Sequence, residues 1–124
     1  IFMIQKELAD RIISKEGSRQ YGRISVMIQS ICQVKKEFNV SANCFFPKPD
    51  VESTVISLQK KKLNEFDYKN LEQIVKISFS QRRKKLKNTL NAIVDYDKLE
   101  KFSDKRPEML SVDDFIYISK IVKI

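Results

Sequence analysis

A run of positive charge between Phe79 and Leu90 is the first feature that could do chemistry. The stretch FSQRRKKLKNTL holds five cations within six positions and no carboxylate: Arg82, Arg83, Lys84, Lys85 and Lys87. Residues 59–88 carry +7 of the formal net charge of +8. Cations concentrated in this way suit nucleic-acid phosphates, because each phosphate that is neutralised releases counterions. The alternative is a solvated face that only keeps the protein in solution.

A second stretch, CFFPKP from Cys44 to Pro49, could hold a flat ring for stacking. Phe45 and Phe46 precede two prolines, which stiffen the chain and cannot donate to a sheet. A ring held rigidly in such a loop can stack on a nucleic-acid base. Composition alone favours the other interpretation, in which both rings fill the hydrophobic core.

Other catalytic side chains are scarce. The chain has no histidine, which excludes Ser-His-Asp catalysis and histidine-containing zinc sites, and its two cysteines are too few for a thiolate-only metal site. With only Gly17 and Gly22, it has no glycine-rich loop to cradle a nucleotide cofactor. Glu7 and Asp10 are better explained as surface charge than as an acid–base pair. Any reaction would therefore depend on residues or a cofactor outside this sequence.

The cysteine content and hydropathy indicate the compartment. Cys32 and Cys44 are predicted to be free, buried thiols in a reducing compartment. No apolar run approaches the roughly 20 residues that span a bilayer. The opening IFMIQKEL does not resemble a signal peptide, because its apolar run is too short and charged residues follow it directly. We expect a soluble cytoplasmic protein with no membrane partner.

Hydrophobic spacing predicts an α/β first half. Ile1 to Ile4 form a continuous apolar run, typical of a strand buried on both faces of a parallel sheet, so the chain is expected to begin in the middle of a domain. The other predicted elements are helices at 8–13 and 24–31 and strands at 32–40 and 51–58, with a loop at 46–50.

The second half has helical spacing throughout. The lysine run 60–62 and the polar residues that follow it predict a linker, with a domain boundary after residue 62. One helix is predicted around residues 71–79, and the stretch 79–94 is predicted to continue as a helix with the cations around its exposed side. A short helix near 99–102 follows, and Ser111 with Asp114 predicts a capping box before the last helix.

Five blocks of the sequence resemble, in the same order, the ribosomal RNA adenine dimethyltransferases. They are QKELADRI (5–12), YGRISVMIQ (21–29), FFPKPDVES (45–53), FSQRRKKLKNTL (79–90) and the R-x-E-x-L-S pattern of 106–111. The related erythromycin-resistance methyltransferases, which act on large-subunit RNA, share the proline loop but lack the YGR-S-V and QRRK blocks. The branch that acts on the small subunit is therefore favoured.

The resemblance implies a fold and an activity. Residues 1–62 would be the last three strands and helices of a Rossmann-like methyltransferase sheet, and 63–124 a small all-helical RNA-docking domain. The parent enzyme would use S-adenosylmethionine to dimethylate N6 of two adjacent adenines near the 3′ end of small-subunit (16S-type) ribosomal RNA during ribosome biogenesis. The adenine leaves its stack, and its nitrogen attacks the sulfonium methyl without needing a histidine.

The resemblance also implies roles for single residues. Phe45 matches the phenylalanine that stacks on the target adenine, with Pro47 and Pro49 supporting the loop, whereas Phe46 is expected to pack. The residues implied to bind RNA are Arg82, Arg83, Lys84, Lys85, Lys87 and Arg23. A structural ion pair explains Arg23 equally well.

The family motifs that bind the cofactor and the adenine N6 precede the QKE block and are absent here. We therefore expect the C-terminal part of such an enzyme, which alone neither binds S-adenosylmethionine nor transfers methyl groups. Its partner would be small-subunit ribosomal RNA within the small ribosomal subunit. The parent enzyme would be monomeric, and an exposed sheet edge at 1–4 could let this chain self-associate. The alternative is a basic RNA-binding or ribosome-assembly module with no chemistry of its own.

Overall fold

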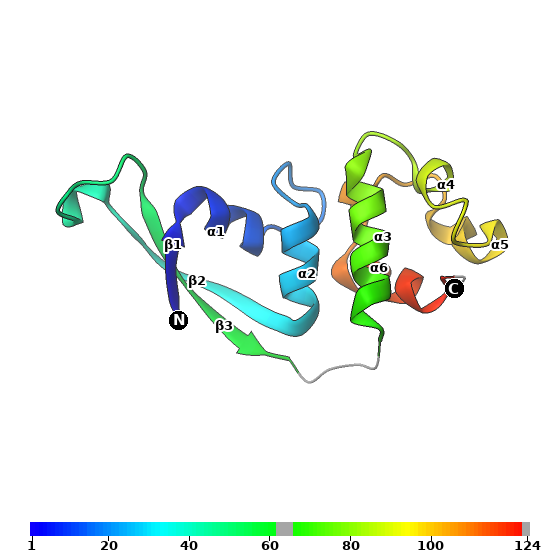
Figure 1. Ribbon diagram of the computed structural model, residues 1–124, viewed down its shortest axis with the longest axis horizontal. Helices are drawn as coiled ribbons and strands as arrows, with labels where there is room; N and C mark the ends of the chain where they lie inside the picture. The colour runs from blue at the N-terminus through cyan, green and yellow to red at the C-terminus, as the bar shows by residue number, and fades with distance from the viewer. Residues whose placement is uncertain (62–65, 123–124) are drawn as a thin grey trace.

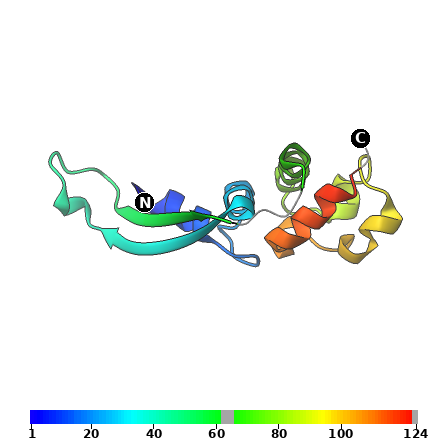
Figure 2. The ribbon, with the colours of Figure 1, turned by 90° about the horizontal axis from the view of Figure 1, so that it is seen from below.

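The computed structural model describes residues 1–61 and 66–122, with a small sheet at one end and a group of helices at the other (Figures 1 and 2). The strands are β1 (Phe2–Gln5), β2 (Cys32–Val40) and β3 (Ser53–Lys60). The α-helices are α1 (Lys6–Ile13), α2 (Arg23–Ile31), α3 (Tyr68–Ser80), α4 (Leu86–Thr89), α5 (Tyr96–Leu99) and α6 (Val112–Lys120). Three 3-10 turns complete the described elements: η1 (Ala42–Cys44), η2 (Glu100–Phe102) and η3 (Pro107–Met109).

The three strands form an antiparallel sheet in the order β1-β3-β2. Helices α1 and α2 pack on it through a small core in which Ala9, Ile12 and Ile56 are buried. The prediction of a parallel, doubly buried first strand is wrong for the described chain: β1 pairs antiparallel with β3, and Phe2 and Met3 are each 54% exposed. A run of four apolar residues has no period that separates an edge strand from a buried one.

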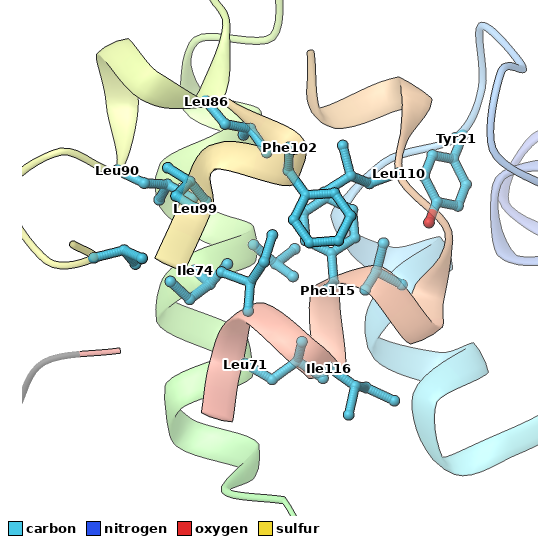
Figure 3. Close-up of a cluster of buried hydrophobic side chains, with 14 residues drawn as sticks. Tyr21, Leu71, Ile74, Leu86, Leu90, Leu99, Phe102, Leu110, Phe115 and Ile116 are labelled. Atoms are coloured by element: carbon cyan, nitrogen blue, oxygen red, sulfur yellow. The ribbon is translucent and has the colours of Figure 1, made fainter. Parts of the chain in front are cut away.

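A larger core lies among the helices and includes part of the first half of the chain (Figure 3). Tyr21, in the loop before α2, and Val26, within α2, are buried together with residues from α3 to α6. Helix α2 therefore faces the sheet on one side and the helical group on the other. The predicted boundary between residues 62 and 63 lies outside the described residues.

The predicted continuous helix over 79–94 is wrong. Helix α3 ends at Ser80 and α4 begins at Leu86, so the cations at 82–85 lie in a connecting loop. The backbone N–H of Leu86 donates to the carbonyl of Lys105 at 2.9 Å, and that of Lys87 donates to the carbonyl of Ser103 at 3.1 Å. These bonds satisfy the first backbone donors of α4 and attach its start to the segment 103–105.

Helix α6 begins as predicted, with a capping box. The Ser111 hydroxyl accepts from the backbone N–H of Asp114 at 3.1 Å, and the Asp114 carboxylate accepts from the backbone N–H of Ser111 at 3.1 Å. The two bonds satisfy backbone donors that a helix start leaves free. The start of α6 is therefore fixed by local sequence.

The hydroxyl of Tyr21 lies in the core without a hydrogen-bond partner among the described residues (Figure 3). A buried unpaired hydroxyl costs about 1–3 kcal/mol. Tyr21→Phe is therefore expected to raise the free energy of unfolding at pH 7 by about 1 kcal/mol, measured by urea denaturation. Val26→Ala serves as the control, because it removes buried apolar volume from the same core without removing a hydroxyl and should destabilise the chain.

The same residue makes stability depend on alkaline pH. Burial, and then the charges of Glu16 and Asp114, raise the pKa of Tyr21 well above its ordinary value of 10.0. A raised folded-state pKa gives stability that is present below pH 10 and is lost as pH rises further, by about 1.4 kcal/mol per pH unit. Urea denaturation at pH 9 and at pH 11 measures the loss. Between these pH values the free energy of unfolding should fall less for Tyr21→Phe than for the unmodified chain, and an equal fall would contradict this assignment.

Candidate nucleic-acid interface

The loop between α3 and α4, residues 81–85, presents positive charge to solvent and is called the basic loop below. Arg83, Lys84 and Lys85 are exposed, whereas Leu86, the first residue of α4, is fully buried and anchors the loop to the core. Among residues 1–61 and 66–122, no carboxylate pairs with Arg83 or Lys84. Two exposed cations without counter-charge are suited to an anionic partner.

Lys85 and Lys87 share one carboxylate, that of Asp104. Asp104 Oδ1 lies 3.1 Å from Lys87 Nζ and 3.9 Å from Lys85 Nζ. The hydrogen bond and charge of Lys87, and then the charge of Lys85, lower the pKa of Asp104 below its usual range. Asp104 is 74% exposed, so the pairs are weak and a phosphate can compete for both lysines.

Removing that carboxylate is expected to strengthen anion binding. Asp104→Asn should tighten binding to ribosomal RNA by about twofold to fivefold, because Lys85 and Lys87 no longer share their charge with a protein carboxylate. The measurement is filter binding at several salt concentrations, with Asp97→Asn on α5 as the control of equal charge change. Since the lowered pKa keeps Asp104 ionised from pH 5 to 8, the gain should be constant over that range.

Arg82 is held by the protein itself. Its Nη2 donates to the carbonyls of Arg19 at 2.8 Å and Tyr21 at 2.5 Å, and its Nε lies 3.7 Å from Glu108 Oε2. The guanidinium also lies over the ring of Phe79, 5.6 Å from its centroid. The sequence prediction grouped Arg82 with the RNA-binding cations, and the structure separates it from Arg83 and Lys84.

These contacts join three distant stretches of the chain. The loop before α2 bonds to Arg82 through the Arg19 and Tyr21 carbonyls, and the backbone N–H of Gly17 donates to the carbonyl of Glu108 at 2.7 Å. Glu108 belongs to the R-x-E-x-L-S pattern of residues 106–111, and its contacts give that pattern a structural role. No local signal in the sequence could have paired Arg82 with this loop.

Arg23 and Arg82 line the same groove, which is separate from Arg83 and Lys84. Arg23 is exposed at the start of α2 and lines this groove of about 890 Å³ between α1, α2 and α3, together with Arg11 and Arg19. No ion pair of Arg23 occurs in the part of the chain that the structure describes. Arg11 is paired with Glu7 at 3.0 Å, and Glu72 also lines the groove, so cations and a carboxylate both face this space.

The loop around Phe45 projects beyond the sheet at the opposite end of the molecule (Figure 1). Phe45 is half-buried and lines a shallow hollow of about 350 Å³ with Pro47 and Pro49, beside Ile4 of β1. The expectation that Phe46 packs is wrong, because its side chain is fully exposed. Adjacent residues of an extended loop point in opposite directions, so only one of the two rings can face the sheet.

The structure corrects the prediction of two buried thiols. Both cysteines are free, but Cys32 is half-buried and Cys44 is exposed on η1. Cys32 begins a strand in which most side chains are exposed, and Cys44 lies on a 3-10 turn with no buried residue. Within the described residues, no helix is both long and apolar enough to cross a membrane.

Comparisons with known proteins identify relatives along nearly the whole chain. The family model described as ribosomal RNA adenine dimethylase matches residues 1–123. The ribosomal RNA small subunit methyltransferase A of Borreliella afzelii (strain PKo) is 43% identical over 125 residues, which cover 96% of this chain and 44% of that protein. The chain thus spans about half the length of the curated relatives it matches.

Two solved structures share the fold. A dimethyladenosine transferase from Plasmodium falciparum matches with a TM-score of 0.85 and 24% identity, covering 98% of this chain and 58% of that one. The 23S ribosomal RNA methyltransferase ErmE matches with a TM-score of 0.65 and 15% identity, covering 95% of this chain and 52% of its own. The three-stranded sheet and its helices therefore have the fold of the corresponding part of these methyltransferases.

Proposed function

Since the chain belongs to the ribosomal RNA adenine dimethylase family, we propose that it is the RNA-facing part of a small-subunit ribosomal RNA methyltransferase. The complete enzyme would dimethylate N6 of two adjacent adenines near the 3′ end of 16S-type RNA during ribosome biogenesis, with S-adenosylmethionine as the methyl donor. The observation that carries this proposal is the 43% identity to a small-subunit methyltransferase along almost all of the chain.

The helical group would hold the RNA by its phosphates. Arg83 and Lys84 supply free charge, and Lys85 and Lys87 add theirs when a phosphate displaces Asp104. Arg23 would contact RNA that enters the groove beside α2. Such contacts position an RNA without reading its sequence. In this scheme Arg82 contributes by fixing the loop before α2 against α3, and residues 63–124 serve as the docking domain.

The loop at the other end would present the adenine. Phe45 has one side against the sheet and lines a hollow open to solvent, which suits a ring that stacks on an extruded base. Pro47 and Pro49 restrict the loop and keep that ring in place. Because the loop that contains residue 45 projects from the sheet and the basic loop belongs to the helical group, the bound RNA would contact both parts of the chain (Figure 1).

The residues of this chain do not by themselves fit the cofactor. Its two glycines, Gly17 and Gly22, both lie between α1 and α2, and Gly17 serves a turn with a φ of +87°. A dinucleotide-type loop instead follows a strand and opens a helix. Isothermal titration of this chain with S-adenosylmethionine is expected to show no binding.

The partner in this proposal is small-subunit ribosomal RNA within the small ribosomal subunit. The enzyme would act in the cytoplasm, and it would be a monomer.

The edge strand β1 offers unpaired backbone groups through which this chain could self-associate when alone. A non-catalytic RNA-binding or ribosome-assembly module is the second candidate, favoured by the uncompensated charge of Arg83 and Lys84.

A mutation pair tests the assigned activity. In the full-length product of the gene, Phe45→Ala is expected to lower kcat/KM for adenine dimethylation of small-subunit RNA about tenfold, because it removes one base–aromatic stack. Phe46→Ala, the matched control, removes an exposed ring from the same loop and should change the rate less than twofold. The measurement is N6,N6-dimethyladenosine formed on unmethylated small subunits, quantified by mass spectrometry.

Two outcomes would count against this assignment. If the full-length product forms no dimethyladenosine yet binds the subunit, the assembly-module candidate replaces the enzyme. If Phe46→Ala lowers the rate and Phe45→Ala does not, the stacking role belongs to the exposed ring.

A further inference from the structure

A second groove, on the sheet side of α2, has no role in the proposed function. It measures about 440 Å³ and lies among the segment after α1, the end of α2 and the strands β2 and β3. Lys15, Lys35 and Lys61 line it, and none of its lining residues is Asp or Glu. The three lysines come from separate parts of the chain, so only the fold brings them together.

One buried glutamine holds two of these lysines. Gln29 is 4% exposed, and its Nε2 donates to the carbonyls of Ile12 at 2.7 Å and Ser14 at 2.8 Å. Its Oε1 accepts from Lys15 Nζ at 3.3 Å, and its backbone carbonyl accepts from Lys61 Nζ at 2.5 Å. The glutamine is thereby fixed in orientation and sets two ammonium groups on one side of α2.

Within the described parts of the chain, no carboxylate compensates the charge of these two ammonium groups. Gln29 offers only neutral acceptors, and no carboxylate pairs with Lys15 or Lys61 among residues 1–61 and 66–122. Lys35 differs, since its Nζ lies 4.0 Å from Glu37 Oε1. Each ammonium has three donors, and the recorded bonds to Gln29 use one on each. Like charges brought together without a counter-ion are destabilising, and an anion between them removes that cost.

From this arrangement we propose that the groove binds a phosphate group through Lys15 and Lys61. A phosphate carries enough charge for two ammonium ions and has several acceptor oxygens for their unused donors. The group can belong to a nucleic-acid backbone or to a free phosphate compound. No residue that lines the groove belongs to the basic loop, so the two sites can be tested separately.

Cys32 provides a local reporter, because its thiol lines this groove whereas Cys44 does not. In a Cys44→Ser background, alkylation of Cys32 by neutral iodoacetamide would be timed with and without sodium pyrophosphate, with sodium chloride keeping the ionic strength equal. Pyrophosphate at several times its dissociation constant is expected to slow alkylation about threefold or more. A second arm replaces pyrophosphate with a single-stranded RNA oligonucleotide.

Two double variants with the same change in net charge test whether Lys15 and Lys61 bind the phosphate. Lys15→Met with Lys61→Met should abolish the protection, while Lys48→Met with Lys98→Met, which removes two exposed lysines outside the groove, should retain it. Lys15→Gln alone keeps the Lys61 bond to Gln29 and should weaken the protection, which provides a test if the double variant fails to fold by circular dichroism. The rate ratio of anionic iodoacetate to iodoacetamide should also fall about twofold to fivefold in the double variant, because two nearby charges are lost.

Each result decides the proposal. Protection by pyrophosphate supports a free-phosphate ligand, and protection by RNA alone supports a backbone phosphate. Absence of protection by both probes overturns the site, as does protection that persists in both the double variant and Lys15→Gln. RNA binding that is retained while Cys32 stays unprotected would remove this site and leave the proposed function intact.

Discussion

Reversing Arg83 and Lys84 to glutamate is expected to weaken binding of the chain to small-subunit RNA about 100-fold near 0.1 M salt. Each reversal removes a phosphate contact and adds a repulsion of similar size. The slope of log affinity against log salt should also fall by about one to two units, since about 0.7–0.9 units accompany each phosphate contact. The measurement is filter binding to purified small subunits across a salt series.

The control for this prediction must change the net charge equally. Lys98→Glu with Lys120→Glu makes the same charge change at exposed positions on α5 and α6, outside the basic loop. We expect it to cost less than fivefold in affinity. Equal losses for the two variants would mean that only overall charge matters and that the loop is not a docking surface. Arg82 is left intact in both, because its loss would alter the fold as well as the charge.

Replacing Arg82 with alanine is expected to lower the free energy of unfolding by about 2–3 kcal/mol. The change deprives the carbonyls of Arg19 and Tyr21 of a charged donor, and bonds of that kind contribute about 1.5–3 kcal/mol each. The total is reduced because the Arg82 side chain is 36% exposed, which lets water replace part of the interaction. Urea denaturation followed by circular dichroism gives the value.

Two variants separate this role from simple loss of charge. Arg83→Ala, one residue away and exposed, should change stability by less than about 0.5 kcal/mol. Arg82→Lys keeps the charge but lacks the planar fork that reaches two carbonyls, so it should restore less than half of the lost stability. Hydrogen exchange at the Gly17 amide, which bonds to Glu108, should accelerate in Arg82→Ala before global unfolding. Unchanged exchange there would show that Arg82 does not hold this loop.

Local sequence was sufficient for the regular elements. The alternation around Lys36 predicted β2, the spacing of Ile24, Met27 and Ile31 predicted α2, and Ser111 with Asp114 predicted the start of α6. These features depend on residues a few positions apart, so a single sequence contains the whole signal. The family resemblance was confirmed by the match over residues 1–123.

The predictions that were wrong depend on how distant parts of the chain pack together, which local sequence does not show. Arginine and lysine are good helix formers, so the local sequence does not indicate that α3 ends at Ser80. The start of α4 bonds to the carbonyls of Ser103 and Lys105, which lie far along the chain. The contacts of Arg82 with Arg19 and Tyr21 likewise cross about sixty positions of sequence. The exposure of Phe46 depends on which way a loop faces the sheet. The assignments of Phe45 and the basic loop to RNA remain predictions.

The burial of Tyr21 and Val26 among the later helices limits how this chain can be recombined. A chimera that took residues 66–122 from one relative and the preceding residues from another would join two unmatched halves of one core. Such a splice would leave a void or a clash around α2 even where both parents are well packed. Exchanges between relatives should therefore carry the loop before α2, α2 itself and the C-terminal helices as a single inherited block.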